Sequence, residues 1–280
     1  MNILITNDDG YNAAGIQALA RVMKRYGHIT VVAPKYHQSG MASACSMGLK
    51  PIAVKKLSET EDEEWYYVDG TPVTCVKFAL EEIFTGQKPD LVMSGINHGA
   101  NSASAVIYSG TLGAAMEATL AGIPGIGVSL DSLSFKADFS AVEEHLPAIL
   151  DRIIPNFSDR RGIFYNINFP KIKGSDIKGV RVCRQGINHW IKQFEPYTTE
   201  LFERFGTTPE KMGVHFPEVE EGEKVWVLTG YMEDDRNNPE KADHHMVDEG
   251  YISVVAHNID STDEIEMERL ENLGIDQDFR

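Results

Sequence analysis

Oxygen-bearing side chains occur in three loops of the sequence, each placed after a short apolar segment. In chain order these loops are residues 8–10, with Asp8 and Asp9; residues 38–40, with Ser39; and residues 94–101, with Asn97 and Asn101. Carboxylate, hydroxyl and amide oxygens are hard ligands, which suit Mg²⁺, Mn²⁺ or Ca²⁺ better than Zn²⁺. Each loop also contains glycine, which lets the backbone and a ligand approach closely. Together the loops predict a site for a divalent cation.

The alternative is that these loops are ordinary turns, because Asp, Asn, Ser and Gly are common turn residues. Asp8 and Asp9 are harder to explain in this way, since two adjacent carboxylates at the end of a buried strand repel one another without a cation. In an open parallel sheet the carboxyl ends of the strands meet at one edge, where ligands bind. Three such loops at one edge therefore favour a functional site.

A helix predicted over residues 109–121 begins next to this site. Ser109 or Gly110 would cap it, which leaves unpaired amides and a partial positive charge at its N-terminus. The helix follows the strand that precedes Asn97, so its N-terminus points to the same edge as Asp8. A divalent cation beside a helix N-terminus predicts a phosphate site.

Several catalytic motifs are absent. The first apolar segment is not followed by GxGxxG, and the sequence holds no GxxxxGK[ST], no GxSxG elbow before a suitable histidine and no HExxH. These absences disfavour dinucleotide-binding, P-loop, serine-hydrolase and zinc-protease sites of the usual kinds. His98 adjoins Asn97 and could reach a leaving group. His244 and His245 stand in a polar segment and are expected to be solvated, whereas Cys75 is expected in the core.

The first half of the chain alternates between apolar segments and segments of helical spacing. Strands are predicted at 3–6, 28–33, 91–93 and 125–130, helices at 15–26, 71–84, 109–121 and 139–154, an antiparallel pair at 52–54 and 65–68, and a long loop at 95–108. This order is typical of βαβ units and predicts an α/β fold with a parallel sheet.

Beyond residue 160 the pattern loosens. Strands are predicted at 164–169, 180–183, 225–228 and 251–255, a polar stretch at 232–248 and a charged helix at 264–273. We therefore divide the chain into a core, residues 1–160, and a C-terminal extension, residues 161–280. Such loose organisation is typical of an arm that completes its core against another subunit.

Composition narrows the functional class. Of 280 residues, 42% are hydrophobic, and 26 basic against 42 acidic residues give a net charge of −16, which disfavours binding to a nucleic acid polymer. No apolar run approaches the roughly 20 residues of a membrane span, and the N-terminus lacks the basic region of a signal peptide. Three cysteines without a CxxC pair indicate reduced thiols, so we expect a cytoplasmic protein.

At the three oxygen-rich loops and at the start of the helix predicted over 109–121, the sequence resembles the SurE family, the survival protein E 5′-nucleotidases of stationary phase. The matching segments are Asn7-Asp8-Asp9-Gly10, Ser39-Gly40, Gly70-Thr71-Pro72, Ser94-Gly95-Ile96-Asn97 with Asn101, Ile107-Tyr108-Ser109-Gly110-Thr111, and, late in the chain, Asp243 with Gly250-Tyr251-Ile252-Ser253-Val254. The chain departs from the family at Thr74 and at Ala105, directly before Val106, where acids are usual.

The resemblance implies a Rossmann-like core and a metal-dependent phosphohydrolase that acts on nucleoside 5′-monophosphates, with 3′-monophosphates and short polyphosphate as further substrates. It implies one divalent cation per subunit, Mg²⁺ or Mn²⁺, held by Asp8, Asp9, Ser39 and Asn97. It assigns the phosphate to Asn101, Ser109, Gly110 and Thr111. From the shared sheet edge of these loops we further expect catalysis to depend on Asp8, Asp9 and Ser109. It also implies a homodimer or homotetramer built through a β-rich C-terminal arm.

Two other functions would use residues of the same kinds. A phosphatase that forms an aspartyl-phosphate needs a second Asp two places after the first, whereas here the acids are adjacent. A nucleotide or metal sensor that binds without turnover stays open.

Overall fold

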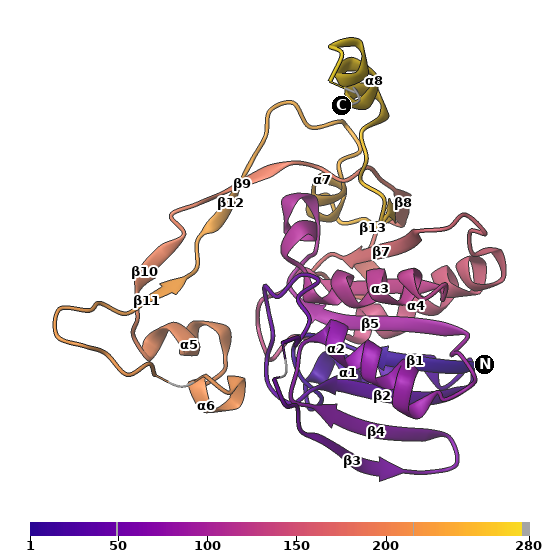
Figure 1. The fold of residues 1–280 in the computed structure, drawn as a ribbon, viewed down its shortest axis with the longest axis horizontal. Helices are drawn as coiled ribbons and strands as arrows, with labels where there is room; N and C mark the ends of the chain where they lie inside the picture. Colours follow the sequence, from indigo (N-terminus) through magenta and orange to yellow (C-terminus); the bar gives the residue numbers. More distant parts are fainter. Residues whose placement is uncertain (49, 215, 276–280) are drawn as a thin grey trace, which may run out of the picture.

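The computed structural model describes residues 1–48, 50–214 and 216–275. A nine-stranded sheet runs through this part of the chain (Figure 1). In spatial order its strands are β3 (Val54–Glu59), β4 (Glu63–Val68), β2 (His28–Pro34), β1 (Asn2–Thr6), β5 (Leu91–His98), β6 (Gly125–Leu130), β7 (Ile163–Phe169), β13 (Ile252–Asn258) and β8 (Val180–Val182).

The six strands from β4 to β7 are mutually parallel, which confirms the predicted α/β class. Antiparallel pairing occurs at both sides of this block, because β3 turns back on β4 and β13 runs against β7. Strands from beyond residue 160 thus complete the same sheet. The boundary that we drew at residue 160 stays a prediction.

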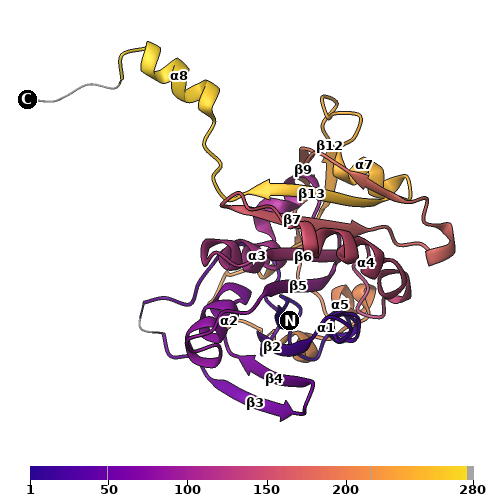
Figure 2. The same cartoon turned by 90° about the vertical axis from the view of Figure 1, so that its right-hand side faces the viewer.

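Helices cover both faces of the sheet (Figure 2). One face carries α1 (Ala14–Met23) and α4 (Ser140–Ile153), and the other carries α2 (Pro72–Phe78) and α3 (Gly110–Leu120). Strand β1 shows why its sequence is apolar throughout: Ile3 and Ile5 pack in the first core cluster, while Leu4 packs in the second. A strand covered on both sides must be apolar on both sides.

The helices predicted in the first half of the chain are confirmed as α1 to α4, and α2 and α3 also have side-chain caps. The hydroxyl of Thr71 accepts the amide of Thr74 at 3.3 Å, and Pro72 occupies the first helical position. A π-helical turn, η1 (Ala79–Ile83), then carries α2 toward Phe84, the predicted end. Cys75 is fully buried, as expected. Shorter 3₁₀ turns are η2 (Ala103–Tyr108), η3 (Ile154–Asn156) and η4 (Gly174–Asp176).

The predicted loop at 95–108 is wrong in its first part, since β5 continues through Asn97 to His98. The pairing of β5 with β6 shifts register after Ser94 and resumes at Asn97 and Ser129. Glycine and polar residues hid this extension, because they interrupt the apolar pattern on which the prediction rested. The strand therefore brings Asn97 and His98 into a buried position.

Residues 187–235 form a long hairpin that extends from the sheet, and we call it the arm (Figure 1). Near its base β9 (Asn188–Ile191) pairs with β12 (Tyr231–Asp234), and farther out β10 (Phe194–Pro196) pairs with β11 (Trp226–Leu228). Two short helices, α5 (Glu200–Phe205) and α6 (Pro209–Met212), lie near its tip. Only β11 was predicted, because strands of three or four residues are too short for a reliable pattern.

The stretch 232–248, predicted as polar and irregular, holds part of β12 and the helix α7 (Asp243–Asp248), which packs on β13. The last helix, α8 (Glu264–Asn272), was predicted and extends away from the sheet (Figure 2). Among the described residues, no helix is both long and apolar enough to cross a lipid bilayer.

Candidate active site

Asp8 and Asp9 lie at the carboxyl end of β1 and are buried, with 3% and 7% of their surface exposed. Asn7 fixes the turn that carries them: its side-chain oxygen accepts the amide of Gly10 at 3.2 Å, and its Nδ2 donates to the Gly10 carbonyl at 3.0 Å. The fully buried residues of β1 anchor this turn from below. The structure thus holds two adjacent carboxylates in a rigid, largely dehydrated position.

Asp8 faces the first turn of α3. The hydroxyl of Thr111 donates to Asp8 Oδ1 at 2.6 Å, and a Cβ added to Gly110 would lie 3.1 Å from the Asp8 Cβ. Burial, with the charge of Asp9 added to it, raises the pKa of Asp8 to about 6. Gly110 is needed here because a side chain would press against the carboxylate.

Asp9 faces two histidines. Its Oδ2 lies 2.9 Å from His98 Nδ1 and also accepts the His98 amide at 3.1 Å, while its Oδ1 lies 3.3 Å from His37 Nδ1. Burial alone would raise the pKa of Asp9, but the two imidazoles outweigh burial and lower the pKa to about 2. The ring of His98 stacks on Phe135 at 5.1 Å between centroids, which fixes its orientation.

The donor set fits a hard divalent cation. Asp9 Oδ1 is buried and has no hydrogen-bond partner among the described residues, although His37 stands at ion-pair distance. Asn97 uses its Nδ2 to donate to the Gly99 carbonyl at 2.8 Å, which leaves its amide oxygen as a donor atom for a metal. A bound cation would satisfy the orphaned carboxylate oxygen and offset the repulsion between Asp8 and Asp9.

Ser39 lies on a loop that is tied to this site but is itself exposed. The amide of Gln38 donates to the Asp8 carbonyl at 2.7 Å, and the amide of Ala42 donates to the Tyr108 carbonyl at 3.1 Å. A Cβ on Gly113 would lie 2.1 Å from the Ala42 carbonyl oxygen, so the loop packs directly on α3. Ser39 directly follows Gln38, whose amide is bound to Asp8, so the loop holds Ser39 at the rim of the site.

The N-terminus of α3 has the predicted cap. Ser109 Oγ accepts the amide of Leu112 at 3.0 Å, and the first intrahelical bond runs from the Gly113 amide to the Ser109 carbonyl at 3.0 Å. The amides of Gly110 and Thr111 precede that bond, so they stand where an anion would bind. The Thr111 side chain faces Asp8, which leaves its amide as the group able to contact phosphate.

Asn101 belongs to a buried amide network that sequence reasoning missed. Its amide donates to Asn168 Oδ1 at 2.8 Å, its carbonyl accepts Asn166 Nδ2 at 2.7 Å, and its Nδ2 donates to Ser129 Oγ at 2.9 Å. Asn166 and Asn168 lie on β7 and are fully buried. Two asparagines at alternate positions of an otherwise apolar strand were the signal that could have revealed them.

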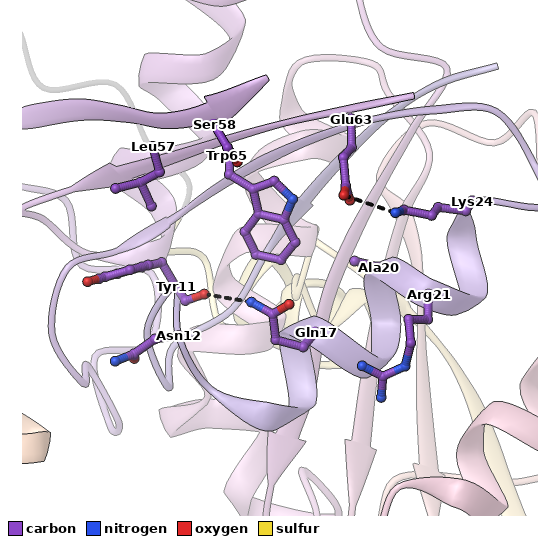
Figure 3. A pocket seen from close by; sticks show the side chains of 10 residues that line it. All are labelled: Tyr11, Asn12, Gln17, Ala20, Arg21, Lys24, Leu57, Ser58, Glu63 and Trp65. Atoms are coloured by element: carbon purple, nitrogen blue, oxygen red, sulfur yellow. Dashed lines mark hydrogen bonds and ion pairs between the residues drawn. The ribbon is translucent and has the colours of Figure 1, made fainter. Parts of the chain in front are cut away.

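Two cavities lie near these residues. One of about 350 Å³ lies between α1 and the β3–β4 pair and is lined by Tyr11, Asn12, Gln17, Ala20, Arg21, Lys24, Leu57, Ser58, Glu63 and Trp65 (Figure 3). It contains none of the predicted site residues, and its Lys24 is paired with Glu63 at 2.9 Å. The other, of about 270 Å³, is lined by residues that include Gln38, Cys45, Gly70 and Thr71. The second cavity therefore adjoins the loop bound to Asp8.

Known proteins match this chain over most of its length. The family model for Survival protein SurE matches residues 3–192. The chain belongs to the SurE family. A protein from Christiangramia forsetii named 5′-nucleotidase SurE is 38% identical over 93% of this chain and 92% of its own length. One of the same name from Cytophaga hutchinsonii is 39% identical over 82% of this chain and 88% of its own length.

Structural comparison supports the same family. The crystal structure of the SurE protein from Aquifex aeolicus is similar with a TM-score of 0.75 and 27% identity, covering 98% of this chain and all of the other. The resemblance seen in the sequence motifs is thereby confirmed. The SurE match starts in β1 and reaches the end of β9, so it includes every residue predicted for the site.

Proposed function

We propose that this chain is a 5′-nucleotidase, a phosphoric monoester hydrolase that releases phosphate from nucleoside 5′-monophosphates. The carrying observation is the contact between Asp8 and the first turn of α3, where Thr111 donates to the carboxylate at 2.6 Å. It joins a carboxylate pair fit for a cation to a helix N-terminus fit for a phosphate. The SurE relatives named 5′-nucleotidases support the same reaction.

We further propose that activity depends on one Mg²⁺ or Mn²⁺ per chain, held by Asp8, Asp9, Ser39 and Asn97. Such an ion would neutralise phosphoryl oxygens and lower the pKa of a bound water. This assignment is supported by the buried Oδ1 of Asp9, which accepts no hydrogen bond from the described residues and has only His37 at ion-pair distance.

The protein's own groups would act on the phosphate from the other side. The amides of Gly110 and Thr111 and the Ser109 hydroxyl would stabilise charge on the equatorial oxygens of the phosphoryl group. Asn101, held by the network on β7, would orient the phosphate. Asp8 or Asp9 would accept the proton of the attacking water. We propose that the nucleoside occupies the cavity beside Gln38.

Phosphate release from a panel of 5′- and 3′-nucleoside monophosphates and short polyphosphate tests this function. The protein is stripped with chelator, and Mg²⁺, Mn²⁺ or Ca²⁺ is added back. We expect release only with metal, and a loss of roughly 100-fold or more in Asp8→Asn, on the scale of removing one preorganised catalytic group. Asp62→Asn, an exposed acid between β3 and β4, is the matched control and keeps full activity.

Absence of release with every metal, while a nucleotide still raises the melting temperature, would instead identify a binding protein without turnover. Release that persists in chelator would contradict the cation assignment. Preference for 3′-monophosphates or polyphosphate would revise the substrate and keep the reaction.

We also propose a cytoplasmic homodimer or homotetramer assembled through the arm. The free cysteines of this chain, Cys45, Cys75 and Cys183, suit a reducing compartment.

The arm exposes large apolar side chains, among them Phe194 and Leu228, each 65% exposed, and Trp226, 51% exposed. Phe194 pairs with Leu228 across the two strands, and Trp226 lies two residues before Leu228, so these side chains form an apolar surface of the kind typical of a protein interface. Sedimentation of the wild type and of the double variant Phe194→Asp, Leu228→Asp tests this assembly. A mass that is the same for both proteins would contradict assembly through the arm.

A further inference from the structure

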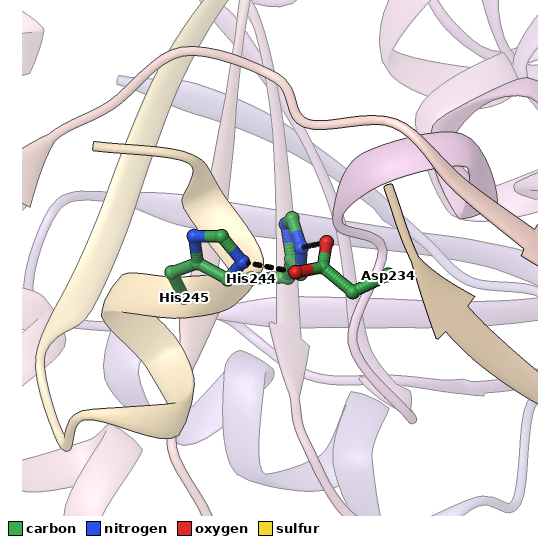
Figure 4. Close-up of side chains that lie close together, drawn as sticks. All are labelled: Asp234, His244 and His245. Carbon is green, nitrogen blue, oxygen red and sulfur yellow. Dashed lines mark hydrogen bonds and ion pairs between the residues drawn. The ribbon is translucent and has the colours of Figure 1, made fainter. Parts of the chain in front are cut away.

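A second group of metal-ligating side chains lies far along the chain from Asp8 and Asp9. Asp234, at the end of β12, stands between the imidazoles of His244 and His245, which lie on α7 (Figure 4). His244 Nε2 lies 2.8 Å from Asp234 Oδ1, and His245 Nε2 lies 2.7 Å from Asp234 Oδ2. One ligand atom from each residue falls within 4.8 Å of the others. We call these three residues the Asp–His–His cluster.

Buried polar contacts and a close glycine hold the ring of His244 in a defined position. Its Nδ1 is buried without a hydrogen-bond partner among the described residues and lies 3.5 Å from the carboxylate of Asp243. That carboxylate is fully buried and accepts the amides of Ala103 and Gly186 at 3.1 and 3.0 Å. A Cβ on Gly186 would lie 2.4 Å from the ring of His244, so glycine there makes room for the imidazole.

This arrangement has a specific chemical reading. The two ring nitrogens of His244 face two carboxylates, Asp234 at 2.8 Å and Asp243 at 3.5 Å, and an imidazole that carries one proton can donate to only one of them. With a metal ion on Nε2, Nδ1 carries the proton and points it at Asp243. Carboxylate–histidine–metal chains of this form are the usual outer support of protein metal sites.

We propose that Asp234, His244 and His245 bind a divalent transition-metal ion such as Zn²⁺. Two imidazoles and one carboxylate suit such ions, whereas Mg²⁺ and Ca²⁺ prefer oxygen ligands. The cluster is therefore chemically distinct from the oxygen-rich site at Asp8. The side chain of Asp234 is 50% exposed and that of His245 32%, so the ion can enter from solvent and keep water ligands.

The position of the cluster suggests what the ion does. Asp234 belongs to the arm, while α7 packs on β13 of the central sheet. A metal bound by both would cross-link the base of the arm to the core. The ion would thereby fix the direction in which the arm leaves the sheet.

Equilibrium dialysis of the full chain against Zn²⁺ tests the site, with Asp8→Asn as the background so that the oxygen-rich site does not contribute. We expect one Zn²⁺ per chain. Adding His245→Ala or Asp234→Ala should weaken binding at least 10-fold. Adding His189→Ala, an exposed histidine of β9 outside the cluster, should leave binding unchanged. Adding His245→Gln retains a polar side chain of similar size and should weaken binding as the alanine variant does.

Equal binding in all these variants, a loss in the His189 control equal to that in His245→Ala, or no bound Zn²⁺ in the background protein would overturn the proposal. Hydrogen exchange supplies a second readout. Zn²⁺ should slow exchange of the β9 and β12 amides when His245 is present and leave it unchanged in His245→Ala. Bound Zn²⁺ without any slowing would overturn the role as a cross-link.

Discussion

At the scale of single residues, the two carboxylates of the site are held in opposite ways. Asp8 is buried against the helix with its pKa raised to about 6, whereas Asp9 is buried between two imidazoles with its pKa lowered to about 2. Folding therefore disfavours the charge on Asp8 and favours the charge on Asp9. The two pKa shifts therefore have opposite effects on the stability of the fold.

In metal-free protein near pH 7.5, Asp8→Asn should raise the free energy of unfolding by about 2–3 kcal/mol, because the charge on Asp8 is the costly form. Asn keeps an oxygen for the Thr111 hydroxyl. A carboxyl with a raised pKa destabilises the fold as pH rises through that value, so the gain should shrink as pH falls from about 6 toward 4. Denaturant unfolding in EDTA at pH 5 and 7.5 measures it.

The adjacent substitution is the control. Asp9→Asn removes a charge that the fold favours, so it should lower the free energy of unfolding by roughly 2 kcal/mol under the same conditions. Two isosteric changes one residue apart would then act with opposite sign. A shift of the same sign in both variants would show that our account of the two environments is wrong.

At the same scale, Asn168→Ala removes the acceptor of the Asn101 amide. A buried donor left without a partner costs about 1–3 kcal/mol, so stability should fall by that amount. Under the proposed function, KM for the nucleotide should also rise, while the affinity for the activating metal stays unchanged. Steady-state kinetics at varied nucleotide and varied metal separate these effects, and a change confined to the metal would contradict the phosphate role of Asn101.

At the scale of elements, the loop 35–45 is positioned by its close approach to α3 at Gly113. Gly113→Ala places a methyl group on the Ala42 carbonyl, so the loop must move and take Ser39 with it. We expect a loss of about 1–3 kcal/mol in stability from overpacking and a several-fold rise in the metal concentration needed for half-maximal activity. Leu120→Ala, at an exposed position of the same helix, should change neither quantity. An unchanged metal dependence in Gly113→Ala would show that Ser39 does not bind the metal.

At the scale of the whole molecule, the net charge of −16 acts against the compact state. At 10 mM salt the screening length is about 30 Å, so like charges repel across the fold, whereas at 150 mM it is about 8 Å. The melting temperature in EDTA should therefore rise by a few degrees between these concentrations, equally with NaCl and KCl. A flat or falling melting temperature would mean that attractive pairs outweigh the repulsion.

The sequence alone determined the parallel α/β core and the edge of the sheet where the loops of Asp8, Ser39 and Asn97 gather. It could do so because a strand covered on both faces must be apolar, and because parallel strands present their carboxyl ends together. Capping chemistry likewise predicted the start of α3 at Ser109. These are local or periodic signals, which a single chain displays without its fold.

Only the tertiary structure decided which side chains meet across long stretches of sequence. Asn166 and Asn168 support a loop more than 60 residues earlier, His37 and His98 converge on Asp9, and Asp234 reaches the two histidines of α7, which we expected to be solvated. None of these contacts has a period or a fixed spacing. They arise because sheet order and the hairpin path bring distant residues together, and a polar pattern read along one dimension does not encode that distance.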